Sequence, residues 1–171
     1  MNARELLTEP IGFLAPARAL EGLSPELADR RVDGATHSIA EIVAHLNFWQ
    51  HWFIRRAEGV AEPMVQHAAE GWPAVAPGAW PALQKQFVDG LSRLTAWADA
   101  TGDALETPLT PAIEFPPLAH YTKRDVLVHV ANRALGIVKY VGLRARHAWH
   151  LSDRREPQFR HRAPRSRPLH S

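Results

Sequence analysis

The segment HSIAEIVAHLNFWQHWFIRRAEG, residues 37–59, has the clearest helix pattern of the chain. Near its start, Ser38 is followed three residues later by Glu41, which is the pattern of a helix-capping box. Apolar side chains recur at steps of three and four residues and form one stripe, made of Ile39, Ile42, Val43, Leu46, Trp49 and Phe53. We therefore expect a helix with one face in a core. His45 lies beside that face, and Asn47 falls on the more polar side.

Two more helices with the same kind of pattern follow along the chain. The first covers about residues 81–100, with Pro81 suited to its first turn, and the second runs over about residues 122–149. Thr122 with Asp125 three residues later again has the spacing of a helix cap. At about 1.5 Å per residue, each helix would extend roughly 30 to 40 Å, as in a helical bundle. Because nothing between the helices alternates like a strand, we predict an all-α fold.

The remaining segments are less regular. Two prolines interrupt an apolar pattern over residues 6–23, which predicts a kinked first helix. Ser24 and Pro25 then have the pattern of a helix cap and a first helical residue, which predicts a short extra turn. Two long connections, residues 59–79 and 102–120, are rich in Pro, Gly and Ala, and we expect them to cover one end of the bundle.

The chain length allows one domain and a tail. Of 171 residues, 46% are hydrophobic, which is enough for one core and too few for two ordinary domains. We divide the chain into a bundle over residues 1–151 and a basic tail over residues 152–171. The tail holds six Arg against Asp153 and Glu156, whereas the rest holds 14 Lys and Arg against 16 Asp and Glu. Its three Pro and few large apolar side chains predict disorder.

The tail also raises the question of nucleic-acid binding. Its Arg residues make weak association with DNA or RNA an open alternative. A merely solvated terminus is favoured, because the tail has no interleaved aromatic residues and no recognisable binding fold behind it. We do not expect nucleic acid to be a main partner.

The composition excludes several classes of chemistry. With no Cys, the chain can form no disulfide, thiolate metal site or cysteine nucleophile. It contains no HExxH motif, no glycine-rich phosphate loop and no GxSxG turn. No apolar run approaches the roughly 18 residues of a membrane span, and no apolar signal core opens the chain, so we expect a cytoplasmic protein. None of these observations names a catalytic residue.

The segment SIAEIVAHLNFWQHWF resembles the second helix of the DinB-like (DinB/YfiT) family, whose pattern SIxELxxHL supplies one metal-ligating His. Here that residue is His45. The resemblance continues through EGWP, through ALQKQFVDGLSRLTAWADATGDAL and into YTKRDVLVHVANRALGIVKYVGLRARHAW, and it covers most of residues 5–149. It implies a compact four-helix bundle, often a homodimer. It also implies relatives that look like metal-dependent enzymes acting with low-molecular-weight thiols.

The last helix departs from the family pattern at the metal site. Family members read HVxNHxxxHxGQI there, and the second and third His complete a three-His site for a divalent ion. In this chain those two ligand positions hold Arg133 and Ile137, and the Gly-Gln pair is replaced as well. The residues that still match are His129, Val130 and Asn132.

This replacement is unfavourable for a metal. A guanidinium has no lone pair to give and stays protonated. At about 5 Å and an effective dielectric constant near 20, it would repel a divalent ion by roughly 6 to 7 kcal/mol. Structural zinc sites gain on the order of 10 to 16 kcal/mol from all of their ligands together. We therefore expect no catalytic metal.

The favoured hypothesis is a small-ligand-binding or non-enzymatic protein, in which the former metal pocket binds an anion. Arg133 would be the fork-shaped donor, and its neighbours would be His45, Trp49, His129 and Tyr140. The alternative is a thiol transferase or hydrolase of the DinB/YfiT type that uses zinc, nickel or manganese. His45 and His129 would then be the remaining ligands. Whether the chain is an enzyme stays open.

A structural alternative assigns the same residues to the fold. In it, His45 is a hydrogen-bonded, mostly buried residue between helices, and Arg133 pairs with a carboxylate such as one from the long connections. The tryptophans would be core or loop-anchoring residues, namely Trp49, Trp52, Trp72 and Trp80.

Overall fold

The computed structural model describes residues 5, 15–32, 34–99 and 102–153. The α-helices within these ranges are α2 (Pro25–Asp29), α3 (Ile39–Ala57), α4 (Trp80–Asp99) and α5 (Lys123–Asp153). Short 3-10 turns lie before and between them, namely η1 (Arg18–Leu20), η2 (Ala68–Gly71), η3 (Gly102–Leu105) and η4 (Pro116–Leu118). The described ranges contain no strand, only an isolated antiparallel bridge between Pro108 and Thr122. The all-α prediction is confirmed.

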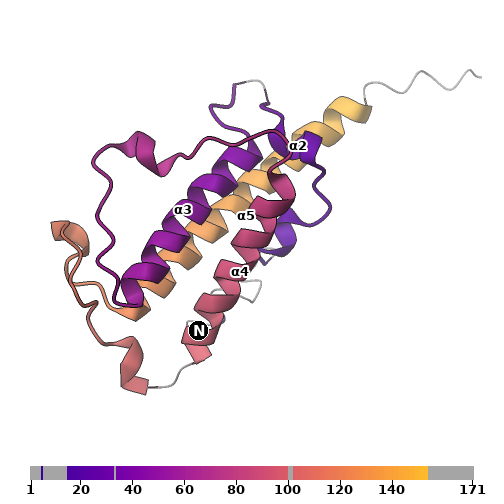
Figure 1. Cartoon of the computed structure of the whole chain (residues 1–171). Helices are drawn as coiled ribbons and strands as arrows, with labels where there is room; N and C mark the ends of the chain where they lie inside the picture. The colour runs from indigo at the N-terminus through magenta and orange to yellow at the C-terminus, as the bar shows by residue number, and fades with distance from the viewer. Residues whose placement is uncertain (1–4, 6–14, 33, 100–101, 154–171) are drawn as a thin grey trace, which may run out of the picture.

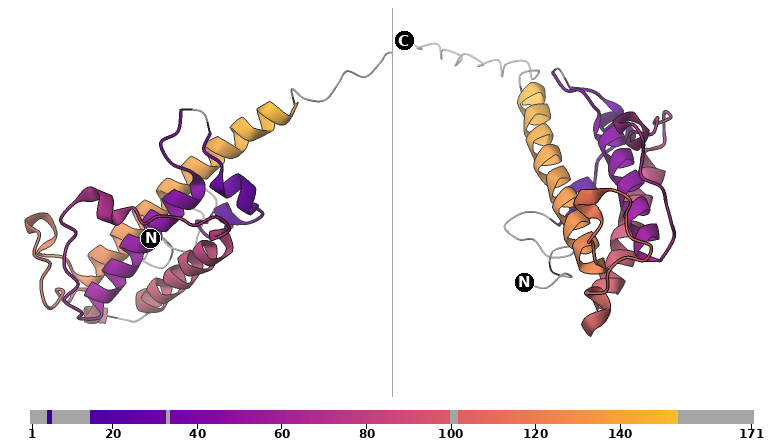
Figure 2. Two further views of the ribbon diagram at one scale, coloured as in Figure 1. Left: turned by 45° about the horizontal axis from the view of Figure 1, so that its top comes forward. Right: turned by 90° about the vertical axis from the view of Figure 1, so that its left-hand side faces the viewer.

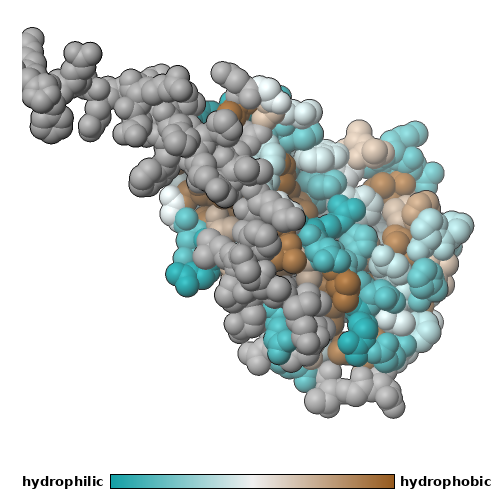
Figure 3. Space-filling view, turned by 180° about the vertical axis from the view of Figure 1, so that it is seen from behind, coloured by the Kyte–Doolittle hydropathy of each residue, from teal (hydrophilic) through white to brown (hydrophobic). Residues whose placement is uncertain are grey.

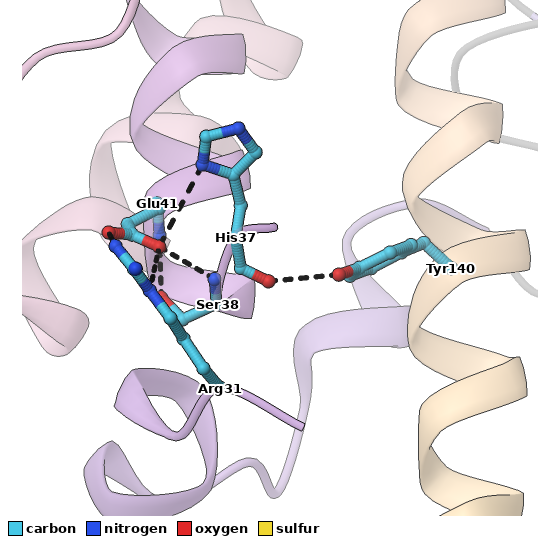
Figure 4. A network of polar contacts seen from close by, with 5 residues as sticks. All are labelled: Arg31, His37, Ser38, Glu41 and Tyr140. Atoms are coloured by element: carbon cyan, nitrogen blue, oxygen red, sulfur yellow. Dashed lines mark hydrogen bonds and ion pairs between the residues drawn. The ribbon is translucent and has the colours of Figure 1, made fainter. Parts of the chain in front are cut away.

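Helix α3 begins with the capping box that the sequence predicts. The Glu41 amide donates to Ser38 Oγ at 3.2 Å, and the Ser38 amide donates to Glu41 Oε2 at 2.7 Å. Arg31, from the preceding segment, donates to the same carboxylate through Nε at 3.1 Å (Figure 4). After the helix ends at Ala57, Gly59 turns the chain with a φ of +88°, a conformation that favours glycine.

The other helix starts also follow the sequence pattern. Ser24 Oγ caps α2 by accepting a backbone amide at 3.3 Å. At α5, the Thr122 amide donates to Asp125 Oδ2 at 2.8 Å, and the Asp125 amide donates to Thr122 Oγ1 at 3.2 Å. Pro81 lies in the first turn of α4, where no intrahelical partner is needed for its nitrogen. These local contacts fix where the helices begin.

The three long helices do not simply alternate in direction along the chain. In Figure 1, α3 and α4 run in the same direction and α5 runs against them. The connection over residues 58–79 must therefore return along α3, whose 19 residues span about 28 Å. The expectation that it covers one end of the bundle is wrong, because two parallel helices can be joined only by such a return. The second connection, residues 102–122, does lie at one end, and Figure 2 shows α5 reaching past the other helices at its C-terminal end.

The core lies where α3, α4 and α5 meet, and α3 contacts both of the others. Its large buried side chains include Ile39, Val43 and Phe53 of α3, Trp80, Phe87 and Leu94 of α4, and Val126, Val130 and Ile137 of α5. Burying a side chain of this size stabilises the fold by roughly 1.5 to 3 kcal/mol. Within the predicted stripe of α3, Ile42 and Trp49 are only partly buried.

Asn47 is an exception to the predicted pattern of α3. The sequence places it on the more polar side, yet it is 3% exposed, because α4 packs against that side. Its Nδ2 donates to the carbonyl oxygen of Leu83 at 2.9 Å. A helix that touches two neighbours buries more than one stripe, and its own periodicity reveals only the stronger one.

Two expectations fall mainly outside the described residues. The kinked helix over residues 6–23 is described only from residue 15 onward, where the chain forms the 3-10 turn η1. The basic tail is described only at residues 152 and 153, which belong to α5.

The described surface is mixed in character. Seen from behind, its coloured apolar residues form small patches separated by polar ones (Figure 3). Among the residues that the structure describes, no helix is long and apolar enough to cross a membrane.

Candidate functional site

His45 connects α3 to the long crossing connection. Its Nδ1 lies 2.6 Å from the carbonyl oxygen of Gly71, so Nδ1 carries the proton and donates. Gly71 is buried, and a Cβ there would lie 3.0 to 3.3 Å from the Trp49 indole. The connection can approach α3 this closely only with glycine at this position. His45 is thus partly buried and hydrogen-bonded, but between a helix and a connection and not between two helices.

Trp72 fixes the next point of the same connection. Its indole stacks on the imidazole of His37 with 3.9 Å between ring centroids, and on that of His45 with 4.0 Å. The EGWP segment thus anchors the crossing connection on the start of α3, in agreement with the anchoring role expected for Trp72. His37 was not among the predicted site residues, because its role depends on where the connection crosses.

His129 uses both of its ring nitrogens. Arg133 Nε donates to Nε2 at 2.8 Å, and because a guanidinium cannot accept, Nε2 must be the unprotonated nitrogen. Nδ1 then carries the proton and faces the Tyr121 hydroxyl oxygen at 3.0 Å. The ring also packs against Phe53, with 4.5 Å between centroids. This imidazole is neutral and has no lone pair left for a metal.

Arg133 is exposed and lies beside aromatic rings. Its guanidinium carbon is 5.9 Å from the centre of the Trp49 ring, and its Nε is held by His129 four residues earlier on α5. Within the described part of the chain, no carboxylate lies within 4 Å of Arg133. The expected ion pair with a connection carboxylate is therefore not formed there.

Several carboxylates of the connections have other partners. Glu62 pairs with Arg55 at 2.7 Å, and Glu106 pairs with Arg124. Glu70 accepts the His67 amide at 2.9 Å and so caps η2. Arg133 instead contacts His129 and Trp49. This explains why the ion pair expected from the sequence is not found.

The two other residues of the altered motif have structural contacts. Ile137 is 2% exposed and belongs to the core. Tyr140 donates from its hydroxyl to the backbone carbonyl oxygen of His37 at 2.9 Å and ties α5 to the start of α3 (Figure 4). The remaining predicted residues form a chain of neighbours, from His45 to Trp49 (6.5 Å between ring centroids), Arg133 and His129.

Burial and charge shift the ionisable groups of this cluster. The pKa of His45 is lowered by burial, against the opposing effect of the Gly71 hydrogen bond, and the Arg133 and His37 charges lower it further. The pKa of His129 is lowered by burial and then by Arg133. The pKa of Tyr121 is raised by burial and then by Asp125. Near neutral pH the cluster therefore combines two neutral imidazoles with one permanent cation.

The donor atoms of this cluster can be compared with those that a metal needs. No group of three or more His, Cys, Asp or Glu that could hold an ion is found among the described residues. His45 Nε2 is the one imidazole nitrogen of the cluster without a hydrogen-bond partner in this part of the chain. The space beside Arg133 and Trp49 is only about 10 Å³, room for a single water molecule. A ligand of Arg133 would therefore contact it at the surface.

The family model described as the DinB superfamily matches residues 17–132. This chain belongs to the DinB superfamily. The match includes His45 and His129 and ends one residue before Arg133. No curated protein and no solved structure matches the chain.

Membership in the DinB superfamily agrees with the all-α fold of the described residues. Fold alone does not assign an activity, so the function has to be inferred from the side chains around His45, His129 and Arg133. Two of its members, Tyr121 and Phe53, are not in the predicted set. Phe53 belongs to the stripe of α3 and reaches His129 where α3 packs against α5. Tyr121 lies just before α5, eight residues before His129.

Proposed function

We propose that this DinB-superfamily protein binds a small anion at Arg133 and does so without a catalytic metal. The observation that carries the proposal is the guanidinium of Arg133, which is held at Nε by His129 and faces no carboxylate of the described chain. Its two terminal amino groups form a planar fork that suits a carboxylate or a phosphate. A low-molecular-weight thiol that carries a carboxylate belongs to the same ligand class.

The donor chemistry supports a metal-independent protein. Arg133 offers no lone pair, Ile137 is packed in the core, and His129 would have to release Arg133 or Tyr121 before it could ligate. An ion near this site would also be repelled by a permanent positive charge. The alternative, a divalent-metal-dependent transferase or hydrolase, rests on His45, whose Nε2 is not hydrogen-bonded within the described residues. One imidazole nitrogen is too few for a stable site.

The open position of Arg133 also limits how tightly an anion can bind. The side chain is exposed, and the space beside it is about 10 Å³, so a small anion keeps most of its hydration. An exposed charge pair contributes roughly 0.2 to 1 kcal/mol, and a fork of hydrogen bonds adds to this. We expect dissociation constants of about 1 mM, or about −4 kcal/mol of binding free energy, for phosphate or a simple carboxylate.

Titration of the full chain with phosphate and with acetate tests this proposal. We expect nuclear magnetic resonance shifts in the side-chain signals of Arg133, Trp49 and His129, and roughly ten-fold weaker binding in Arg133→Gln, since a charge-assisted hydrogen bond is lost. Arg124→Gln is the matched control, because Arg124 is also exposed on α5 but is already paired with Glu106. Equal binding by the unaltered chain and Arg133→Gln, or no binding by either, overturns the proposal.

A further inference from the structure

A hollow with a volume of about 640 Å³ lies away from Arg133. It is lined by α3, by the crossing connection and by the first turns of α4, and it is open to solvent on one side. We call it the connection pocket and define it by Asn47, Phe48, Trp52, Glu70, Val75 and Leu83, six of its lining residues. No residue of the His45, Trp49, His129 and Arg133 cluster lines it. Its volume falls in the range of small-molecule sites, roughly 300 to 1,000 Å³.

The outer wall of the connection pocket is held in place by specific contacts. The Trp52 indole nitrogen donates to the carbonyl oxygen of Pro63 at 2.8 Å, and Arg55 holds Glu62 at 2.7 Å. Further along, His45 donates to the carbonyl oxygen of Gly71 at 2.6 Å. Because both edges of the wall are bonded to α3, the hollow between them is pre-formed and does not depend on a ligand to open it.

The lining of the connection pocket combines an apolar body with negative charge. Phe48, Trp52, Val75 and Leu83 provide aromatic and aliphatic surface. Glu62 and Glu70 also line it, whereas no Lys or Arg does among the described residues. Arg55 partly neutralises Glu62, but Glu70 has no cationic partner within the described ranges. An anionic ligand would be repelled here, and a cation with a hydrocarbon body would be attracted.

A buried side chain fixes one wall of the connection pocket. Asn47 is 3% exposed, and its Nδ2 is fixed by the carbonyl oxygen of Leu83 at 2.9 Å. Its orientation is therefore set, and its Oδ1 has no hydrogen-bond partner in the described structure. Less than 1 Å² of this oxygen is accessible, so Asn47 positions the wall of the pocket, and the charge preference of the pocket rests on its carboxylates.

We propose that the connection pocket binds an amphipathic organic amine. The hydrocarbon part packs on Phe48, Trp52 and Leu83, and the ammonium group lies toward the carboxylate of Glu70. This site is independent of Arg133 and selects the opposite charge. The chain would then have two ligand sites on different sides of α3, one for an anion and one for an amine.

Calorimetric titration of the full chain with 2-phenylethylamine tests the proposal, with 2-phenylethanol and phenylacetate as neutral and anionic probes of similar shape. We expect the amine to bind most tightly and the acid not at all. In Glu70→Gln, which can still accept the His67 amide, amine binding should weaken by about two- to five-fold. Glu114→Gln removes an exposed carboxylate that does not line the pocket and should leave amine binding unchanged.

A filled pocket provides the second arm of the test. Val75→Trp or Leu83→Trp should abolish amine binding while circular dichroism and the melting temperature show a folded chain, and Arg133→Gln should leave amine binding unchanged. Two variants are used because one of them could disturb the fold. Equal binding of the alcohol and the amine, no binding of the amine, or full binding by a folded pocket-filling variant would each overturn the proposal.

Discussion

His45 and His129 are two partly buried imidazoles on facing helices, and they are held in different ways. In His45, Nδ1 donates a hydrogen bond to the carbonyl oxygen of Gly71, and Nε2 has no hydrogen-bond partner in the described chain. In His129, Nδ1 is hydrogen-bonded to the Tyr121 hydroxyl, and Nε2 accepts a hydrogen bond from Arg133 Nε. Both lie within the residues that match the DinB superfamily model, but only one has a ring nitrogen whose lone pair is not already used. Whether a His can ligate a metal ion is therefore decided by its neighbouring side chains and not by residue type alone.

The largest expected effect concerns the residue one turn beyond Arg133. Ile137 is 2% exposed, so Ile137→Ala leaves a cavity and should lower the free energy of unfolding by about 2 to 5 kcal/mol, measured by urea denaturation. Val128→Ala on the same helix is the control, because Val128 is 37% exposed and its truncation should cost no more than about 0.5 kcal/mol. Similar effects of the two changes would show that position 137 is not part of the core.

The second effect tests the anchoring of His45. In Gly71→Ala the new Cβ would lie 3.0 to 3.3 Å from the Trp49 indole, which is itself packed among aromatic rings. We expect a loss of about 1 to 3 kcal/mol in the free energy of unfolding and a changed His45 signal. Gly136→Ala has nothing within 4 Å of its Cβ and should instead stabilise α5 by about 0.5 to 1 kcal/mol. A neutral Gly71→Ala would argue against close docking of the connection.

The pH dependence of stability should reflect both imidazoles. Burial lowers the pKa of His45 and of His129 below 6.5, so the unfolded chain takes up protons at a higher pH than the folded chain does. The stabilisation from keeping them neutral is complete above about pH 6.5 and is lost as the pH falls through their folded pKa values. Urea midpoints should therefore fall between pH 7.5 and 5, and less steeply in His129→Gln. An unchanged slope in His129→Gln would contradict this assignment.

The smallest expected effect is on the pKa values of the two imidazoles, which lie at different distances from the Arg133 guanidinium. Arg133 lowers the pKa of both, but it contacts only His129. Arg133→Gln should therefore raise the pKa of His129 more than that of His45, as followed by nuclear magnetic resonance titration of the ring protons. A larger change at His45 would place Arg133 elsewhere in solution.

Much of this fold can be predicted from short-range patterns in the sequence. The Ser38 and Glu41 pair and the Thr122 and Asp125 pair predict the starts of α3 and α5 because capping depends on residues three apart. The contact between His129 and Arg133 is likewise a local one, since residues four apart are neighbours on a helix.

Other features depend on segments far apart in the chain. Tyr140 donates to His37, which is 103 residues away, and α4 buries Asn47 on a side that the stripe of α3 leaves polar. The connection pocket exists because the return path of residues 58–79 stands away from α3 between its anchors. No periodicity within a single segment encodes such a path, and so the site is less predictable than the helices that carry it.

We propose that the unaltered chain binds no catalytic metal because Arg133 and Ile137 stand where the DinB-like sequence pattern has two His ligands. The most direct measurement is the metal content of the full chain, purified after supplementation with zinc, nickel and manganese, beside the double variant Arg133→His and Ile137→His, with melting curves to show that both are folded. We predict one equivalent of metal in the folded double variant and far less than one in the unaltered chain. One tightly held equivalent in the unaltered chain, with perturbed signals of His45 and His129, would contradict the claim.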